Sequence, residues 1–339
     1  MTPAKDSDGS GAPRVVVLIV TWNRVDEAVR CLESFARLRY PNYEVLVVDD
    51  ASRDATVSVV RERYPWATMI ANGQNLGYAG ASNVGFRAAL AAGADYVFLL
   101  NQDTELTEGV LSELVRIMES DPRIAIAGAK NILLDNEKYL WGRYGVINWG
   151  PVLVRTVGRS EPDGPVDSPR DVDFVIGNGC LMSARALTEV GLFDETFFQM
   201  HEDVDWSMRA RRAGYRAVYV DTAAIYHKGS SSSDPTKRVL FGARYFVGRN
   251  ALFFARKYAN PWQWTKLLLL MTFGVVMRVT MQIAYASFCA LREQLPFVTG
   301  MADGLRGIVR GPRPPKETPA GPAPPLNTPI DRLVRWLGG

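Results

Sequence analysis

Strand patterns and helix patterns alternate four times between residues 15 and 119 of this chain. Runs rich in β-branched and aliphatic residues predict two buried strands, at 15–20 and 45–48, and two further strands, at 67–71 and 95–100. Apolar residues with helical spacing predict a helix after each strand, at 24–37, 54–63, 78–92 and 107–119. Consecutive βαβ units need parallel strands whose two faces are covered by helices. The sequence therefore predicts an α/β fold with an open, mostly parallel, Rossmann-like sheet flanked by helices.

The sequence that follows has a less regular pattern. Residues 130–175 combine short strand-like runs with aromatic residues and turns, which indicates an irregular or antiparallel part of the same domain. Short helices are predicted at 184–190 and 204–213, and a strand at 217–220. We expect this domain to cover residues 14–235, after a disordered tail at 1–13.

The charge is divided unevenly along the chain. From residue 236 to the end there are 15 Lys and Arg against 4 Asp and Glu, a net charge of +11, so the first 235 residues carry −8. A basic segment can bind nucleic acid or the anionic face of a membrane. The long leucine-rich stretch within it favours the membrane, and we expect no nucleic-acid partner. We therefore predict a basic, apolar, helical extension at 236–310 that associates with a membrane.

Residues 267–291 are mostly apolar but contain Arg278. A membrane span needs about 20 apolar residues, and a central Arg costs about 2.5–3.5 kcal/mol on insertion scales. Three interpretations stay open: a helix on the membrane surface, a true span, and a helix packed on the preceding domain. Residues 311–329 contain eight prolines and predict a flexible tail, which ends in a short amphipathic segment before residue 339.

Other familiar sites are disfavoured by what the sequence lacks. Three widely spaced cysteines exclude a disulfide framework and zinc spacing of the CxxC type, and they fit a reducing cytosolic environment. The sequence has no GxxxxGK[ST] phosphate loop and no GxGxxG fingerprint, which disfavours P-loop and NAD-type sites.

Small polar residues follow each of the four predicted strands. The segments are 21–24 (TWNR), 49–52 (DDAS), 72–83 (NGQNLGYAGASN) and 101–104 (NQDT). Each could simply cap a helix. However, the carboxyl ends of parallel strands meet at one edge of a sheet, where ligands bind in such folds. We therefore expect a ligand site there.

A second polar cluster lies downstream. Glu202, Asp203 and Asp205 are placed to favour the dipole of a helix that starts there, but a carboxylate after the preceding hydrophobic run could also be desolvated and act as a base. His201 and His227 are the two histidines. If His227 approaches Asp103, the two side chains and diphosphate oxygens would suit Mn²⁺ or Mg²⁺.

Taken together, these motifs resemble those of the family 2 inverting glycosyltransferases of GT-A fold, and most closely their bacterial rhamnosyltransferase-like branch. The resemblance covers about residues 14–249. It rests on VTWNR, VVDDAS, NLGYAGASN, the strand-ending NQD, GLFDETFFQMHEDVDW and AIYHKGSS.

The resemblance implies a role for each matching residue. The nucleotide and donor sugar would be held by Thr21, Asn23, Arg24, Asp50, Asn75, Gly77, Tyr78, Asn101, Gln102 and Asp103. A divalent cation, Mn²⁺ or Mg²⁺, would be bound by Asp103 and His227, where Asn101 replaces the first aspartate of the DxD motif. Asp203 would be the catalytic base, with Gly179, Glu202 and Trp206 near the acceptor or the donor sugar, although Trp206 could equally pack in the core.

The resemblance also implies the reaction. A sugar, with dTDP-rhamnose as the leading donor, would move from its nucleotide to a bacterial surface glycan or a lipid-linked acceptor by inverting displacement. Alternatives are a UDP-sugar transferase (galactofuranosyl or N-acetylglucosaminyl), a polyprenyl-phosphate sugar synthase, and a non-catalytic nucleotide- or glycan-binding module. We expect the enzyme at the cytoplasmic face of the inner membrane, peripheral or weakly anchored through the extension, and an oligomer is compatible with the sequence.

Overall fold

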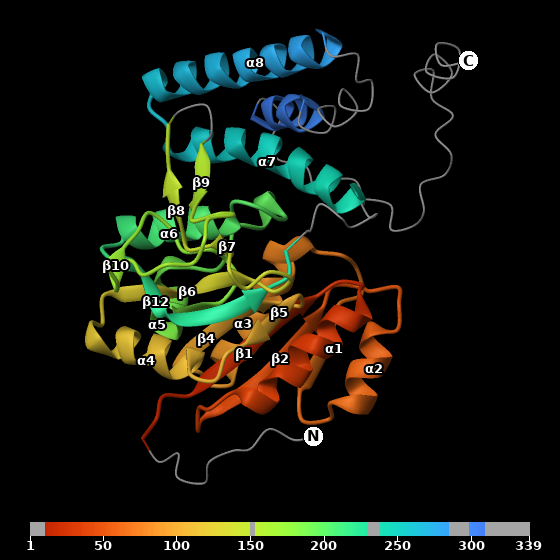
Figure 1. The fold of residues 1–339 in the computed structure, drawn as a ribbon, viewed down its shortest axis with the longest axis vertical. Coiled ribbons are helices and arrows are strands. Elements are labelled where there is room, and N and C mark those ends of the chain that lie inside the picture. The colour runs from red at the N-terminus through yellow and green to blue at the C-terminus, as the bar shows by residue number, and fades with distance from the viewer. Residues whose placement is uncertain (1–10, 150–152, 230–236, 285–297, 309–339) are drawn as a thin grey trace.

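A computed structural model describes residues 11–149, 153–229, 237–284 and 298–308. The proline-rich tail predicted at 311–339, most of the tail predicted at 1–13, and residues 285–291 of the long apolar stretch lie outside these ranges. Within them, the chain forms one large sheet with helices on both faces and a group of C-terminal helices at one end (Figure 1).

The four predicted N-terminal strands form one half of the sheet. In space they run in the order β3 (Thr68–Ala71), β2 (Tyr43–Asp49), β1 (Val15–Thr21) and β4 (Tyr96–Asn101), and all three pairings are parallel. Both faces of β1 are fully buried, as the unbroken apolar run predicts. The polar loops after β1, β2, β3 and β4 therefore lie at one edge.

The other half of the sheet is mixed, which corrects the prediction of a mostly parallel sheet. β11 (Cys180–Ser183) lies antiparallel between β4 and β6 (Ile124–Leu133), and β6 pairs in parallel with β12 (Arg216–His227). Local periodicity cannot show this insertion, because it brings β11 beside strands that are distant in the sequence. Shorter strands complete the fold: β5 (Thr104–Leu106) and β10 (Arg170–Asp171) on β12, β7 (Leu140–Gly142) on β6, and a separate hairpin of β8 (Tyr144–Ile147) and β9 (Val154–Val157).

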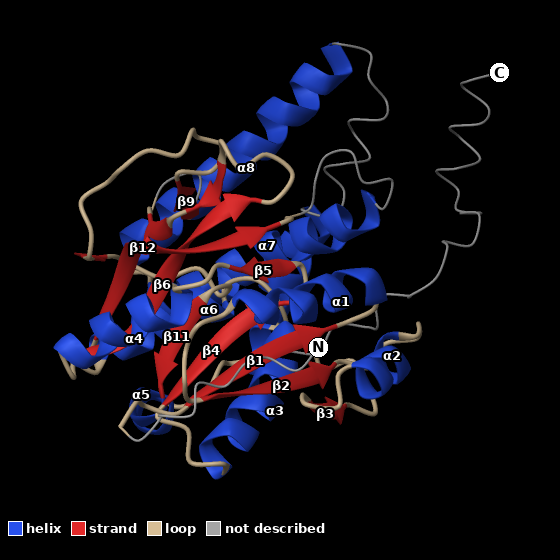
Figure 2. Cartoon of the chain, turned by 60° about the horizontal axis from the view of Figure 1, so that its bottom comes forward, coloured by secondary structure: helices blue, strands red, loops and turns tan. Residues whose placement is uncertain are grey.

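Helices cover both faces of the sheet (Figure 2), and a hydrophobic layer lies between the sheet and the helices on each face. One face packs on α1 (Val25–Ser34), α2 (Thr56–Arg63) and α4 (Val110–Ser120). The opposite face packs on α3 (Gly77–Ala91), α5 (Ala184–Val190) and α6 (Glu202–Arg212). Successive β1 residues alternate between these layers, Val17 in the first and Leu18 in the second, because side chains alternate along a strand.

The C-terminal helices pack on the α/β domain through a third apolar cluster. α7 (Lys237–Tyr258) and α8 (Pro261–Ala284) contribute Leu252, Phe254 and Leu267, which are fully buried together with Phe197 and Val204. A further helix at 298–308 approaches α7 closely, since a Cβ at Gly300 would lie 2.1 Å from the carbonyl oxygen of Tyr245. Among the described helices, none has the length and apolar content needed to cross a membrane.

Candidate active site

The pairing of β5 with β12 brings Asp103 and His227 together. These two strands are antiparallel with Thr104 opposite His227, so Asp103, one residue before β5, lies at the carboxyl end of β12. The backbone N–H of Lys228 donates to the carbonyl of Asp103 at 3.0 Å and closes this junction. His227 Nε2 and Asp103 Oδ1 lie 3.1 Å apart. The side chains of Asp103 and His227 therefore lie close together, as the family resemblance implies.

The environment of the pair keeps Asp103 ionised. Burial alone would raise the pKa of the Asp103 carboxyl, but its interaction with His227 and the nearby Arg24 guanidinium outweigh burial and lower it. His227 is buried with its ring 4.7 Å from that of Trp141. Within the described residues its Nδ1 has no hydrogen-bond partner.

The side chains of Asp103 and His227 provide ligand atoms that suit a divalent cation. A carboxylate oxygen and an imidazole nitrogen are both ligands for Mn²⁺. The described ranges hold no cluster of three or more His, Cys, Asp or Glu residues that could enclose an ion. The remaining ligands would thus have to come from a substrate, and diphosphate oxygens are suitable.

Asp203 lies in the first turn of α6, where two backbone groups hold its carboxylate. Its Oδ2 accepts from the N–H of Gly177 at 2.9 Å, and its Oδ1 accepts from the N–H of Val204 at 2.8 Å. Burial nevertheless raises the pKa of Asp203 above its usual value. Burial, and then the neighbouring Asp203, raise the pKa of Glu202 well above its usual value. A carboxylate with a raised pKa near a sheet edge is suited to accept a proton.

Asn178 and Tyr78 join the regions of Asp103 and Asp203. The side-chain Oδ1 of the buried Asn178 accepts from the N–H of Asn101 and from the hydroxyl of Thr104, both at 2.9 Å. The hydroxyl of Tyr78 donates to the carbonyl of Gly177 at 2.7 Å. Asn178 is missing from the residues singled out in the sequence, although it stands in the GNG turn at 177–179 that includes Gly179. Its role depends on partners more than 70 residues away.

The loops after β1 and β2 hold each other in place. Thr21 donates its hydroxyl to Asp49 at 3.1 Å, and the side chain of Asn23 accepts from the N–H of Arg53 at 2.9 Å. Asp50 Oδ1 accepts from the N–H of Leu76 at 2.8 Å, so this carboxylate also fixes the loop after β3. Burial raises the pKa of Asp50, with the hydrogen bond from Leu76 acting in the opposite direction. These residues are thus assembled at the predicted edge.

The start of α3 is built around close contact with a second loop. Asn75 accepts from the N–H of Gly77 at 2.9 Å, and Gly77 has a φ of 74°. A Cβ at Gly77 would lie 2.5 Å from the ring of Phe198. The N–H of Ala79 donates to the carbonyl of Phe198 at 2.9 Å. The donor loop predicted from the sequence is therefore in contact with the segment that precedes Asp203.

The NQD segment and Arg24 have defined partners. The side chain of Gln102 forms two hydrogen bonds with the backbone of Trp22. Its Oε1 accepts from the N–H at 3.0 Å, and its Nε2 donates to the carbonyl at 3.2 Å. Asn101 Oδ1 is buried and has no partner among the described residues. Arg24 lies 2.9 Å from Glu27, which also pairs with Lys228 at 3.2 Å. Glu27 therefore pairs with both cations, and the charge of Arg24 also acts on the Asp103 carboxyl.

Two of the residues expected near the acceptor or the donor sugar, Trp206 and Gly179, serve the packing of the fold. Trp206 is fully buried and donates its indole N–H to the carbonyl of Gly191 at 2.7 Å, so it packs in the core rather than facing a ligand. Gly179 has a φ of 72°, and a Cβ there would lie 2.4 Å from Ile225. Glu202, by contrast, is buried next to Asp203, and its Oε2 has no partner within the described part of the chain.

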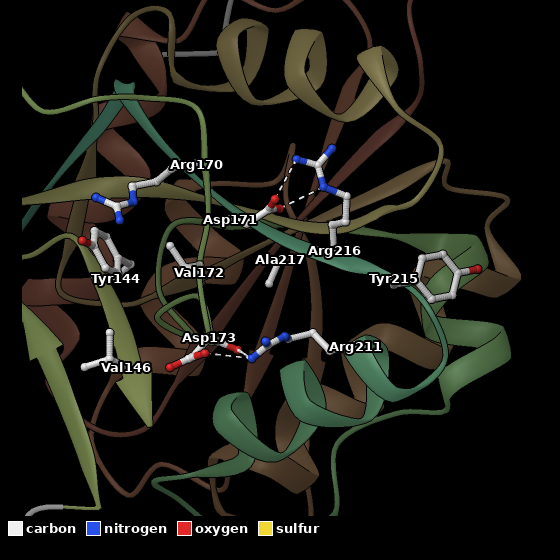
Figure 3. Close-up of a pocket in the computed structure, with 10 residues that line it drawn as sticks. All are labelled: Tyr144, Val146, Arg170, Asp171, Val172, Asp173, Arg211, Tyr215, Arg216 and Ala217. Atoms are coloured by element: carbon white, nitrogen blue, oxygen red, sulfur yellow. Dashed lines mark hydrogen bonds and ion pairs between the residues drawn. The ribbon is translucent and has the colours of Figure 1, made fainter. Parts of the chain in front are cut away.

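A cavity of about 430 Å³ lies at the opposite end of β12 from His227 (Figure 3). Its wall includes Arg216, the first residue of that strand, and Arg211 and Asp173. The arginines are engaged in ion pairs, Arg211 with Asp173 and Arg216 with Asp171, each at 2.9 Å. This cavity is separate from the edge that carries Asp103.

Comparison with known proteins identifies the family. The sequence model described as "Glycosyltransferase like family 2" matches residues 13–245. The chain belongs to this family. It is a nucleotide-sugar-dependent glycosyltransferase, and the resemblance stated from its motifs is confirmed.

Relatives of this glycosyltransferase include rhamnosyltransferases. It is 28% identical over 249 residues to an N-acetylglucosaminyl-diphospho-decaprenol L-rhamnosyltransferase of Mycobacterium tuberculosis, covering 66% of this chain and 79% of that protein. It is 24% identical over 312 residues to the dTDP-rhamnosyl transferase RfbF of Shigella flexneri, covering 88% and 98%.

Solved structures confirm the GT-A fold. The structure of GalNAc-T7 with UDP, GalNAc and Mn²⁺ aligns with a TM-score of 0.55 at 18% identity, covering 71% of this chain and 51% of that one. A mannosyltransferase of Pyrobaculum calidifontis in complex with GDP-Man and Mn²⁺ aligns with a TM-score of 0.52 at 17% identity, covering 100% of this chain and 83% of the other. At these identities the likeness supports the fold alone.

Proposed function

We propose that this glycosyltransferase moves L-rhamnose from dTDP-rhamnose to a bacterial surface glycan or a lipid-linked acceptor, with inversion at the anomeric carbon. The observation that carries the proposal is the 3.1 Å approach of His227 to Asp103 at the sheet edge, which also bears Asp50 and the loop bonded to Asp203. The Mycobacterium and Shigella relatives are both named as rhamnosyltransferases, which supports rhamnose as the sugar, and the decaprenol in the name of the Mycobacterium relative supports a polyprenyl-linked acceptor.

Asp203 is the residue proposed to activate the acceptor. An acceptor hydroxyl is a weak nucleophile until its proton is removed. As its oxygen forms a bond to the anomeric carbon, the bond from that carbon to the diphosphate breaks, dTDP leaves, and the proton passes to the Asp203 carboxylate. Attack from the side opposite the diphosphate inverts the configuration. The raised pKa of Asp203 makes its carboxylate a stronger base than an exposed aspartate.

Asp103 and His227 are the residues proposed to hold a divalent cation with the diphosphate. When bound, such a cation stabilises the negative charge that develops on the leaving group. Arg24 and Lys228, both near Glu27, are placed to add positive charge at the same position. The solved structures of GalNAc-T7 and of the Pyrobaculum mannosyltransferase contain Mn²⁺, which supports a cation of this kind.

The experiment compares the wild type with Asp203→Asn on a panel of dTDP- and UDP-sugars. We expect turnover with dTDP-rhamnose, and a loss of about 10²–10⁴-fold or more in Asp203→Asn with unchanged dTDP affinity. Near-normal turnover of this variant would remove Asp203 from the role of base. Turnover with UDP-galactofuranose or UDP-GlcNAc in place of dTDP-rhamnose would replace the proposed sugar.

We also propose that α8 attaches the enzyme to the anionic cytoplasmic face of the inner membrane. Its Leu267 and Met271 are buried, whereas a stripe on the opposite side is exposed: Trp262 by 73%, Leu269 by 66%, Phe273 by 62% and Val276 by 55%. These positions share one helical face, because they are spaced by seven, four and three residues. An apolar stripe on a basic segment is typical of an interfacial helix.

Sedimentation with vesicles tests this attachment. The full chain should bind vesicles that contain anionic phospholipid, and high salt should weaken binding. The double variant Leu269→Glu and Phe273→Glu should lose binding, whereas Val166→Glu, at an exposed apolar residue of the catalytic domain, should keep it. Equal binding by both variants would contradict the role of α8.

A further inference from the structure

The segment that leads into the base has an unfavourable backbone conformation. Phe198, Met200 and His201 have φ values of 63°, 67° and 74°, in the left-handed region that side-chain-bearing residues rarely adopt. Asp203 follows this segment by two residues. Such a conformation persists only where the surroundings hold it. The groups that hold it therefore influence where the Asp203 carboxylate lies.

Two buried polar residues of α7 hold this segment. The amide nitrogen Nδ2 of Asn250 is within hydrogen-bond range of the carbonyls of Phe197, Gln199 and Met200, at 2.9, 2.8 and 2.6 Å. Arg249 donates through Nη2 to the carbonyls of Thr196 and Phe197, at 2.8 and 2.7 Å.

The two side chains also hold each other. Arg249 Nε donates to Asn250 Oδ1 at 2.8 Å, which leaves the amide nitrogen of Asn250 pointing at the segment. Both residues are buried, with 3% and 0% of their surface exposed. Burying a guanidinium and an amide is costly unless their donors find acceptors. Here those acceptors are the carbonyls of residues 196–200.

These two residues lie beyond the part of the chain that the family match covers, which ends at residue 245. α7 itself is anchored by Leu252 and Phe254 in the cluster that contains Phe197 and Val204. The helix at 298–308 packs behind it, since a Cβ at Gly304 would lie 2.9 Å from the carbonyl oxygen of Arg249. The C-terminal extension is thus in contact with the segment before the base.

We propose that Asn250 and Arg249 are positioning residues that fix the Asp203 carboxylate for proton transfer, so that α7 belongs to the catalytic unit. The proposal rests on Asp203 being the base. Apolar packing alone would need neither an amide nor a guanidinium here, whereas these two side chains direct their donors at four backbone carbonyls of the segment, those of Thr196, Phe197, Gln199 and Met200.

The test is Asn250→Ala in the full chain, with Leu252→Ala as the matched control. Leu252 is fully buried in the same helix and cluster but forms none of these hydrogen bonds, so its loss weakens apolar packing while every donor to the segment stays in place. We expect Asn250→Ala to lower kcat about 10- to 100-fold, because a small displacement of a catalytic group is costly. The affinity for dTDP should change by less than about threefold.

The pH dependence of kcat gives a readout that a merely structural role would not move. The titratable groups around Asp203 are Glu202 on its own helix, Tyr78 on α3 and Cys180 on β11. A loosened segment admits water to Asp203 and reduces the burial that raises its pKa. The acid limb of kcat should therefore move to lower pH in Asn250→Ala and stay in place in Leu252→Ala.

The outcomes separate the two proposals. If Asp203→Asn is inactive and Asn250→Ala matches Leu252→Ala in kcat and pH limb, the positioning role is wrong while the base assignment stands. If Asp203→Asn turns over normally, the proposed function fails first. If Asn250→Ala does not accumulate as folded protein, Arg249→Lys serves instead. It keeps the buried charge but cannot reproduce the guanidinium contacts, and unchanged kcat in this variant would overturn the proposal.

Discussion

The side chain of Asn178 accepts a hydrogen bond from the backbone N–H of Asn101 over 2.9 Å. This contact ties the segment that carries Asp103 to the turn whose Gly177 holds Asp203. The buried side-chain amide of Asn178 therefore fixes the position of Asp103, proposed to serve the leaving group, relative to Asp203, proposed to activate the nucleophile. Loss of this one side chain would therefore be expected to move both acids.

Asn178→Ala should lower both stability and transfer. It leaves the N–H of Asn101 and the hydroxyl of Thr104 without their acceptor, which we expect to cost about 2–4 kcal/mol of the free energy of unfolding. Displacement of the two loops should reduce kcat about 10- to 100-fold. Denaturant unfolding and steady-state kinetics measure these effects. Thr104→Val, which removes one donor and keeps the bond to Asn101, should cost about 1 kcal/mol and retain most transfer; an equal loss in both variants would argue against the linking role.

Gly77→Ala should damage the donor loop. The new Cβ would meet the Phe198 ring at 2.5 Å, and the φ of 74° is unfavourable for alanine. We expect a loss of about 2–4 kcal/mol of stability, together with weaker dTDP binding. Gly73 lies in the same loop with nothing within 4 Å of its Cβ position, so Gly73→Ala should change stability by about 0.5 kcal/mol or less. Thermal unfolding and dTDP titration of the two variants check this contrast.

His201 should make the protein less stable as the pH falls from about 6.5 to 4. Burial lowers the pKa of His201 to about 4, so over this range the unfolded chain binds a proton that the folded protein excludes. His201→Asn removes this titration, and Asn tolerates the left-handed backbone at this position. Relative to the wild type, the variant should therefore gain about 2–4 kcal/mol between pH 6.5 and 4. Urea unfolding at several pH values measures the difference, and a constant gap would show that His201 does not titrate in this way.

Chelation of divalent cations should lower transfer about 10²–10³-fold, since the leaving diphosphate loses a major source of charge stabilisation. Added Mn²⁺ should restore the wild type. In Asp103→Asn, Mn²⁺ should no longer strengthen dTDP binding, which calorimetry measures without turnover. Asp171→Asn, at the opposite end of β12 and paired with Arg216, should keep the full response to Mn²⁺. Undiminished transfer by the wild type after exhaustive chelation would exclude the proposed cation.

The four N-terminal strands and helices follow from local patterns. The apolar runs form β1, β2 and β4, which are largely buried on both faces, whereas β3, at the edge of the sheet, stays partly exposed; helical spacing places Leu32, Phe86 and Leu114 in the core. Because parallel strands end at a common edge, the same patterns predict that the polar loops meet there. The family resemblance added the expectation that Asp103 and His227 meet. The pairing of β5 with β12 brings them together, because the antiparallel register places Thr104 opposite His227.

Other features depend on contacts between distant parts of the chain. β11 inserts antiparallel between β4 and β6, and Trp206 turns into the core, although neither is marked by the local pattern. Asn178 and Asn250 look like ordinary polar residues in the sequence, yet each is buried against backbone groups tens of residues away. Secondary structure reflects periodicity over a few residues, and local pattern was sufficient for the four N-terminal strands and helices, whereas β11 was not predicted and β12 was predicted only in part. The buried amides that align the acids required the folded chain, because a hydrogen-bond donor has no defined partner until packing brings one within about 3 Å.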